Sequence, residues 1–352
     1  MRETTLPARH CPCGTQIASG LLSCPACQRL VYAEELKRLA ARAQTAEQEG
    51  DTSGALREWR QALDLLPRDS RQYGVIQAKV EKLSRLVEAG VPPLPSKSGT
   101  RPAPSGDKKH SAWKGAGAVG VVLLLWKFKW LVAAALSKGK LLLLGLTKAS
   151  TLFSMILSLG LYWTAWGWKF ALGLIVSIYI HEMGHVTALI RYGIKATPPM
   201  FLPGVGAVVR LKQQIVSPRE DARVGLAGPM WGLGAAAGAY AVSLAMSWPS
   251  WAAIARVGAW INLFNLLPVF SLDGARGFHA LSRGQRALAA AVVAGAWFLT
   301  SEGLLLLLLI VAGARAFGGQ SAEKADHVAL AQYVFLVAAL SALAVIHVPL
   351  PI

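Results

Sequence analysis

Residues 181–185 read HEMGH and lie inside the apolar run GLIVSIYIHEMGHVTALI, which is typical of a buried helix. Histidines four positions apart stand on one face of a helix, one turn apart, so the imidazoles of His181 and His185 can bind a single Zn²⁺. Glu182 then lies beside the metal, where its carboxylate can take a proton from water. The pattern predicts a hydrolytic metal centre inside a hydrophobic helix.

A catalytic zinc needs a third protein ligand and an open fourth position. Carboxylates are scarce in the apolar part of the chain, since Glu182 is the only acid between positions 108 and 219 and Asp273 the only one between 222 and 301. The candidates are Asp273, His279 and Glu302. A carboxylate at membrane depth is costly and therefore indicates function. We expect Asp273, because it ends the apolar segment INLFNLLPVFSLD at the same side as the two histidines.

The pair of motifs HEMGH and NLLPVFSLDG, about ninety residues apart, resembles the site-2 protease family of intramembrane zinc metalloproteases over residues 150–285. The family's element LAGP is matched by residues 226–229. The resemblance implies zinc ligands, a general base, a polar residue that handles the substrate or its oxyanion, and an assisting amide. His181, His185 and Asp273 match the zinc ligands, and Glu182 matches the general base. Asn265 matches the polar residue, and Asn262 is the assisting amide.

The segment 200–211, MFLPGVGAVVRL, is apolar, β-branched and too short to span a membrane. Irregular backbone at membrane depth occurs only where protein or a cavity shelters it. In the family a comparable segment forms a strand or re-entrant loop beside the zinc, and an exposed edge can hold an unwound substrate as an added strand. We expect substrate contacts at Gly204, Val205, Gly206 and Ala207; the alternative is a loop that plugs the membrane core.

The four cysteines of the chain all lie between positions 11 and 27. Cys24-Pro-Ala-Cys27 is a CxxC turn, and Cys11-Pro-Cys13 precedes it. Two such turns can offer four thiolates to one structural zinc. The short spacing of the first turn leaves His10 open as a replacement for Cys11. Residues 1–31 therefore resemble a zinc ribbon, and zinc thiolates imply a reducing, cytoplasmic compartment.

Composition indicates the elements that must hold these residues. Hydrophobic residues make up 54% of the 352 residues and charged ones 16%, and the net charge is +17. These values exclude an ordinary soluble protein, and a basic excess beside apolar runs favours contact with anionic lipid rather than with nucleic acid. We expect an α-helical multi-pass protein of the cell membrane. The basic loops 191–223 and 271–286 place the cytoplasm on the side of the N-terminal domain.

The domain organisation follows from changes along the chain. Residues 32–90 predict three amphipathic helices that resemble a tetratricopeptide repeat, acting either as a peptide-docking module or as a spacer. A Pro- and Ser-rich flexible linker follows at 91–111, and the lysine-interrupted segment 112–148 predicts helices at the membrane surface. The protease core is expected at 149–285. Membrane helices are expected at 286–352, where 286–316 forms one long span or a tight pair.

Together these features predict a zinc metalloendopeptidase with one catalytic and one structural zinc, which cleaves membrane-spanning or membrane-associated substrates near the cytoplasmic face. Residues 1–90 are expected to recruit a cytoplasmic protein partner. One alternative is a non-catalytic zinc-binding membrane scaffold, which an intact Glu182 disfavours, because structural zinc requires no base. A second is another HExxH peptidase with Glu302 as the third ligand, which the LDG motif disfavours.

Overall fold

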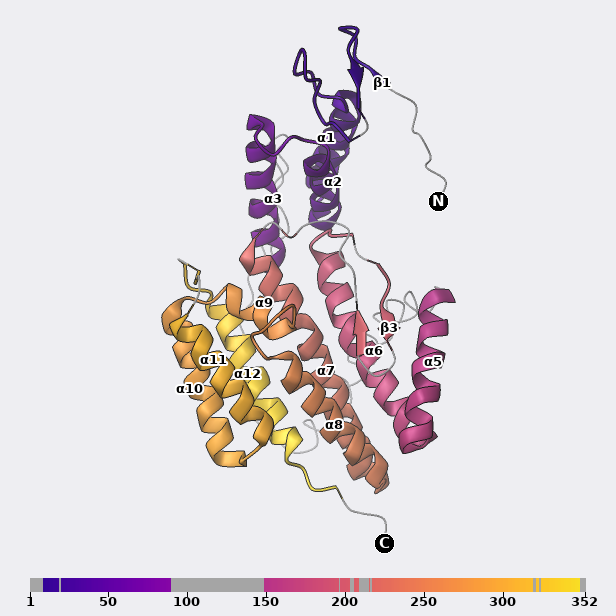
Figure 1. The fold of residues 1–352 in the computed structure, drawn as a ribbon, viewed down its shortest axis with the longest axis vertical. Helices are drawn as coiled ribbons and strands as arrows, with labels where there is room; N and C mark the ends of the chain where they lie inside the picture. Colours follow the sequence, from indigo (N-terminus) through magenta and orange to yellow (C-terminus); the bar gives the residue numbers. More distant parts are fainter. Residues whose placement is uncertain are drawn as a thin grey trace, which may run out of the picture.

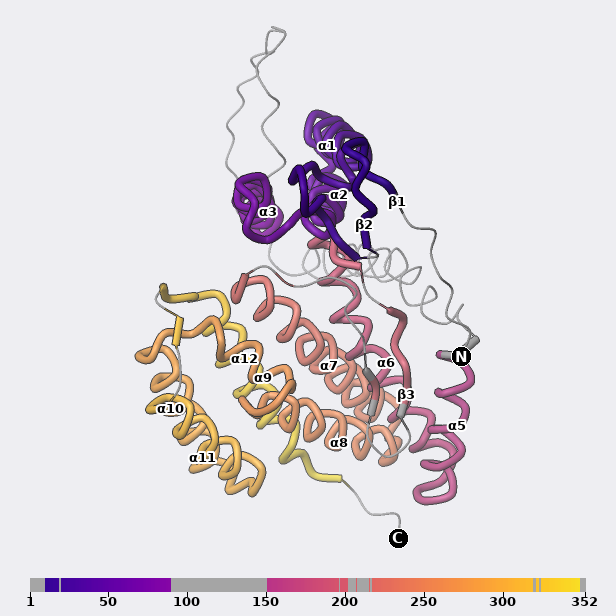
Figure 2. Tube along the Cα trace, turned by 45° about the horizontal axis from the view of Figure 1, so that its top comes forward, coloured from indigo at the N-terminus to yellow at the C-terminus, as the bar shows by residue number. Residues whose placement is uncertain are grey.

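The computed structural model describes residues 9–18, 20–89, 149–195, 197–202, 206–208, 215, 217–318, 321–322 and 324–348. A small cysteine-bearing unit is followed by a three-helix module, and a larger assembly of helices lies below them (Figures 1 and 2). The expected linker 91–111 and surface helices 112–148 lie outside the described residues. We call α1–α3 the helical module and α5–α12 the helical core.

The helical module forms at the three places where the sequence predicts helices. It consists of α1 (Ala33–Gln48), α2 (Thr52–Asp64) and α3 (Arg71–Ala89). Asp51 begins α2 by accepting a hydrogen bond from the Gly54 N–H, which satisfies one of the free donors of the first turn. Leu39, Leu56, Trp59 and Val80 are buried between the three helices. The module therefore has an apolar core of its own.

The helical core contains eight helices within the described residues. They are α5 (Ala149–Trp166), α6 (Trp168–Arg191), α7 (Pro218–Met246), α8 (Pro249–Asn265), α9 (Asp273–His279), α10 (Arg283–Thr300), α11 (Gly303–Phe317) and α12 (His327–Ala344). By length and composition, α6 and α12 can each cross a membrane, and α11 and residues 151–166 are shorter apolar helices. Ser301 adopts a left-handed conformation (φ 55°) that ends α10, so the segment 286–316 is a helical pair and not one long span.

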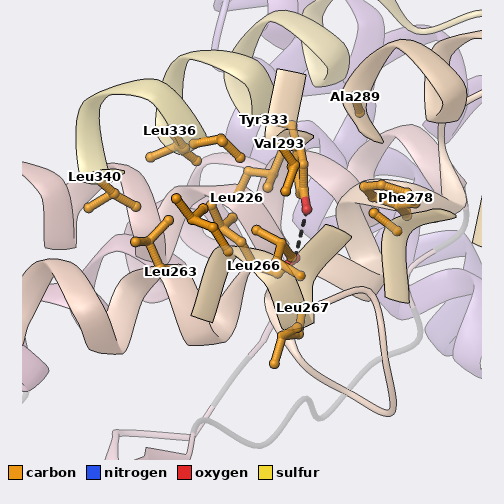
Figure 3. Close-up of a cluster of buried hydrophobic side chains, with 14 of the residues drawn as sticks. Leu226, Leu263, Leu266, Leu267, Phe278, Ala289, Val293, Tyr333, Leu336 and Leu340 are labelled. Atoms are coloured by element: carbon orange, nitrogen blue, oxygen red, sulfur yellow. Dashed lines mark hydrogen bonds between the residues drawn. The ribbon is translucent and has the colours of Figure 1, made fainter. Parts of the chain in front are cut away.

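One hydrophobic cluster fixes α7, α8, α9 and α12 against each other (Figure 3). Phe278 of α9 packs edge-on against Tyr333 of α12, with ring centroids 4.9 Å apart. The Tyr333 hydroxyl donates to the carbonyl oxygen of Leu266 at 2.9 Å, just after α8 ends. Because α9 begins at Asp273, this packing sets the position of the predicted third ligand.

A short antiparallel hairpin joins α6 to α7. It pairs β3 (Met200–Leu202) with β4 (Gly206–Val208), with Phe201 opposite Ala207. Ser154 of α5 accepts a hydrogen bond from the Phe201 N–H, and the Phe201 ring stacks on Tyr179 of α6 at 6.4 Å. The hairpin therefore lies between α5 and α6 and contacts α6 at Tyr179, one helical turn before Glu182.

Candidate metal centre

The two histidines of the HEMGH segment lie on one face of α6. Their Nε2 atoms are 3.2 Å apart, and both side chains are buried. This is the arrangement expected from an i, i+4 pair whose rings turn toward a common point.

Asp273 reaches the same point from the first residue of α9. Its Oδ2 lies 3.1 Å from His181 Nε2, and its Oδ1 lies 3.3 Å from His185 Nε2. Tetrahedral zinc with bonds of about 2.0–2.1 Å separates its ligand atoms by about 3.3 Å. The two Nε2 atoms and the two carboxylate oxygens therefore have spacings close to those that a zinc ion requires, and their chemical types match a catalytic site of three protein ligands.

Hydrogen bonds at the far side of each ring fix the tautomers. Asn262 Oδ1 accepts from His181 Nδ1 at 2.8 Å, and the carbonyl oxygen of Val224 accepts from His185 Nδ1 at 2.8 Å. A carbonyl oxygen only accepts, so Nδ1 of each ring carries the proton and each Nε2 presents a lone pair. The Asn262 Nδ2 group donates to Gly258 O at 2.7 Å, which sets which way its amide faces.

Close approach of α7 to α6 depends on glycine. A Cβ built on Gly228 would lie 2.2 Å from His185 Nε2 and 2.7 Å from His181 Nε2. A Cβ on Gly184 would lie 2.4 Å from the Ala227 carbonyl oxygen. The LAGP element thus supplies the one residue type that lets α7 pass this near the two imidazoles.

Glu182 lies on α6 with the two histidines, and Asn265 lies on α8 with Asn262. Glu182 is buried at 7% exposure on α6, between the two histidines. Asn265 is partly buried at the end of α8, three residues after Asn262 and thus on a neighbouring part of the same helix face. In the structure Asn262 contacts His181, whereas the family resemblance implies that this amide assists Asn265 at the substrate.

The other two candidate ligands stand apart from the cluster. His279 is exposed at the C-terminal end of α9. Glu302 lies 3.7 Å from Arg256 and accepts a hydrogen bond from Trp260 at 3.4 Å. Among the described residues, the metal-type groupings are His181 with His185 and Asp273, and the four cysteines.

The predicted substrate segment is described only in part. Gly206 and Ala207 lie in β4, whereas Gly204 and Val205 lie outside the described residues. The hairpin packs against α6 through Phe201 and Tyr179, which brings this strand pair to the same helix that carries His181.

The four cysteines form a second cluster, between β1 (Arg9–His10) and the turn at 24–27. Cys11 Sγ lies 3.5 Å from Cys27 Sγ, and Cys13 Sγ lies 3.6 Å from Cys24 Sγ. Zinc–sulfur bonds of about 2.3 Å give tetrahedral S···S distances of about 3.8 Å, so the cluster fits zinc. His10 is exposed in β1 and is not part of the cluster.

The backbone of the cysteine unit prepares it for a metal. The N–H of Cys11 donates to Thr15 O, and the N–H of Cys24 donates to Arg29 O, which closes the two turns. Hydrogen bonding to Thr15 lowers the pKa of Cys13 to about 6. The lowered pKa favours the zinc-binding thiolate form at Cys13, whereas the pKa of Cys11 in the same cluster is raised.

Comparison with known proteins supports the same chemistry. Residues 169–252 match the profile of Peptidase family M50. The match includes α6 with both histidines and α7 with the LAGP element, while Asp273 lies beyond it. No curated protein and no solved structure matches the chain. The family match supports a membrane metalloprotease.

Proposed function

We propose that this chain is an intramembrane zinc metalloprotease that hydrolyses peptide bonds of membrane-spanning or membrane-associated proteins near the cytoplasmic face. The observation that carries the proposal is the convergence of two Nε2 atoms and one carboxylate at 3.1–3.3 Å within a helical apolar core. A zinc site built on three protein ligands leaves the fourth position for chemistry.

Each residue of the proposed site has a definite task in this reaction. When bound, zinc supplies Lewis acidity, which polarises a carbonyl and acidifies water. His181, His185 and Asp273 would hold it, with Asn262 and Val224 O keeping the two rings oriented. Glu182 takes the proton from the attacking water and later delivers it to the departing amine. Asn265 is proposed to donate its amide N–H to the oxygen of the scissile carbonyl.

Substrate binding is proposed at the β3–β4 hairpin. Helical substrates hide their carbonyl groups in backbone hydrogen bonds, so a segment must unwind before attack. An unwound segment can pair with a strand edge through main-chain hydrogen bonds. Support comes from the hairpin's contact with α6 through Phe201 and Tyr179, because Tyr179 lies one helical turn before Glu182 on the same face of α6.

The cysteine cluster is proposed to bind a second, structural zinc in the cytoplasm. The basic loops are proposed to contact anionic lipid, and the N-terminal domain to lie on the cytoplasmic side of the cell membrane. A zinc-binding scaffold without activity is less favoured, because a scaffold has no need of the buried Glu182 carboxylate beside the two histidines.

The deciding experiment compares the wild-type chain with Glu182→Gln on co-expressed single-span reporter proteins. The glutamine keeps the size of the side chain but cannot accept the proton, so we expect cleavage to fall by about 10²–10⁴-fold with zinc still bound. Glu302→Gln is a matched control, because it makes the same change outside the cluster. Equal cleavage by the wild type and Glu182→Gln would remove the protease assignment.

A further inference from the structure

The helical module is hydrogen-bonded to the C-terminal end of α6. The Ser53 hydroxyl donates to the Arg191 carbonyl oxygen at 3.0 Å, and the Arg191 guanidinium donates to Val87 O at 2.6 Å. The Tyr192 hydroxyl donates to Glu88 at 3.2 Å. These contacts join α2 and α3 to the residues that follow the HEMGH segment by only two turns of helix.

The fit between the module and α6 is close enough to require a glycine. Gly193 has a φ of +66°, and a Cβ there would lie 2.7 Å from the backbone N of Arg57 and 3.0 Å from Ser53 O. The chain that leaves α6 thus runs directly against the backbone of α2. Any side chain at this position would separate the two parts.

Arg60 of α2 lies at the centre of this contact and is 2% exposed. Its Nη2 forms an ion pair of 2.8 Å with Glu220 of α7, which is 1% exposed, and its Nε donates to Tyr192 O at 3.0 Å. One guanidinium therefore holds the end of α6 and the start of α7 together. A buried ion pair is strongly destabilising to break, since each charge would lose its partner without gaining water.

The first turn of α7 extends this connection to α9. Asp221, next to Glu220, accepts a hydrogen bond of 2.8 Å from Arg276, which follows Asp273 by three residues on α9. A Cβ on Gly225 would lie 3.1 Å from the Asp273 carbonyl oxygen, so α7 and α9 touch beside the third ligand.

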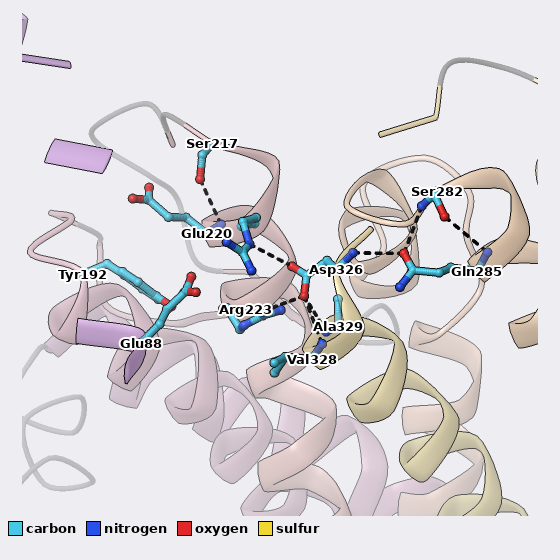
Figure 4. Close-up of polar contacts among 11 residues, drawn as sticks. Glu88, Tyr192, Ser217, Glu220, Arg223, Ser282, Gln285, Asp326, Val328 and Ala329 are labelled. Carbon is cyan, nitrogen blue, oxygen red and sulfur yellow. Dashed lines mark hydrogen bonds and ion pairs between the residues drawn. The ribbon is translucent and has the colours of Figure 1, made fainter. Parts of the chain in front are cut away.

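The next turn of α7 contacts α12. Arg223 forms an ion pair of 2.8 Å with Asp326, which caps α12 (Figure 4). Ser217 accepts the Glu220 N–H and begins α7. The start of α7 is thus linked by charged side chains to α2, α9 and α12.

We infer that Arg60 is a positioning residue for the proposed proteolysis, and that the helical module belongs to the proteolytic unit rather than hanging from it as a separate docking domain. This inference rests on the proposed function. By tying Tyr192 O to Glu220, Arg60 holds α6, which carries His181 and His185, in register with α7. Through Asp221 and Arg276, α7 in turn holds the helix that presents Asp273.

The test uses the full-length chain with Arg60→Ala, Arg60→Lys, Glu220→Gln and the control Arg42→Ala. Arg42 belongs to the same module but makes its 2.9 Å ion pair with Glu58 at the surface, away from the core. We measure kcat and KM on a purified single-span reporter, and the zinc affinity of the histidine site by chelator competition. The helical content of each variant, measured by circular dichroism, reports whether the helical module is folded.

We expect Arg60→Ala to lower kcat by at least about tenfold and to weaken zinc binding at the histidine site, because sub-ångström shifts of catalytic groups cost rate steeply. KM should change little, since Arg60 touches no substrate. Arg60→Lys keeps the positive charge but not the several N–H donors of the planar guanidinium. Its kcat should therefore lie between those of the wild type and Arg60→Ala. Glu220→Gln should also lower kcat and weaken zinc binding at the histidine site, and Arg42→Ala should match the wild type in both.

The two possible failures are distinguishable. Wild-type cleavage that Glu182→Gln abolishes, with Arg60→Ala as active as the wild type, would leave the proposed function standing and overturn this inference. A faster Arg60→Ala would also overturn it, because the module would then restrain the site. A loss of activity accompanied by a loss of helical content, and not restored by Arg60→Lys, would show unfolding of the module and overturn it as well. Cleavage by Glu182→Gln at the wild-type rate would instead refute the proposed function itself.

Discussion

Gly228→Ala is the smallest change that should destroy the metal centre. The added methyl group would lie 2.2 Å from His185 Nε2 and 2.7 Å from His181 Nε2, against about 3.4 Å for an ordinary contact. Either α7 or the rings must move by about 1 Å. Metal–ligand distances tolerate only about 0.2 Å, and a 1 Å misplacement of catalytic groups costs about 10²-fold in rate. We therefore expect at least about a hundredfold loss of cleavage, together with loss of the zinc held by the histidines.

The assay pairs reporter cleavage with metal analysis of the same purified protein. Gly234→Ala is the matched control, since it makes the same substitution six residues further along α7, where a Cβ meets nothing within 4 Å. That control should cleave normally, and its helix should gain about 0.5–1 kcal/mol of stability from the better helix former. The cysteine-bound zinc should stay in both variants.

The reasoning would be refuted by a Gly228→Ala protein that keeps wild-type cleavage and a full complement of zinc. Such a result would mean that α7 does not run against the two imidazoles as the geometry indicates. A variant that loses activity but keeps the histidine-bound zinc would show that the methyl group blocks substrate and not the metal.

Three further predictions concern the ligands and their supports. Asp273→Ala should abolish cleavage and release the histidine-bound zinc while His279→Ala and Glu302→Gln stay active; metal loss from His279→Ala alone would make the ligand set wrong. Asn262→Leu should weaken zinc binding at this site by about 10–100-fold, measured by chelator competition, because His181 loses the partner that fixes its tautomer; unchanged affinity would rule out this role. Full-length protein should contain two zinc ions per chain and Cys24→Ser one, by elemental analysis, and an unchanged count would exclude the cysteine site.

Local sequence patterns predict many of the helices that the structure contains. The three helices of the module appear where amphipathic periodicity predicts them, and α6 occupies the apolar run around the HEMGH segment. Asp273 could be selected from sequence because acids are so rare there that few alternatives exist. The sequence does not decide between one long helix and a helical pair at 286–316. The turn between α10 and α11 depends on Ser301 in a left-handed conformation, which residues other than glycine rarely adopt.

The contacts that could not be predicted join segments that are distant in sequence. Glu220 stands three residues after Ser217, so the sequence alone shows an acid in the first turn of a helix and gives no sign of its partner Arg60. The bond from His185 goes to the backbone carbonyl of Val224, and a carbonyl is present at every residue. Asn262 is a visible polar residue in an apolar helix, but its partner depends on how α8 packs on α6.

The charge of the centre explains why the metal site needs both of its carboxylates. Two neutral imidazoles, fixed by Asn262 and Val224 O, contribute no charge, so a Zn²⁺ ion would be balanced only by the carboxylates of Asp273 and Glu182. Their two negative charges equal its two positive ones, which gives a neutral cluster. In a medium of low dielectric constant a neutral cluster is the arrangement with the smallest desolvation cost. A third acid would leave a net negative charge, and Asp273→Asn a net positive one, so even this isosteric change should weaken the site about as much as removal of the side chain.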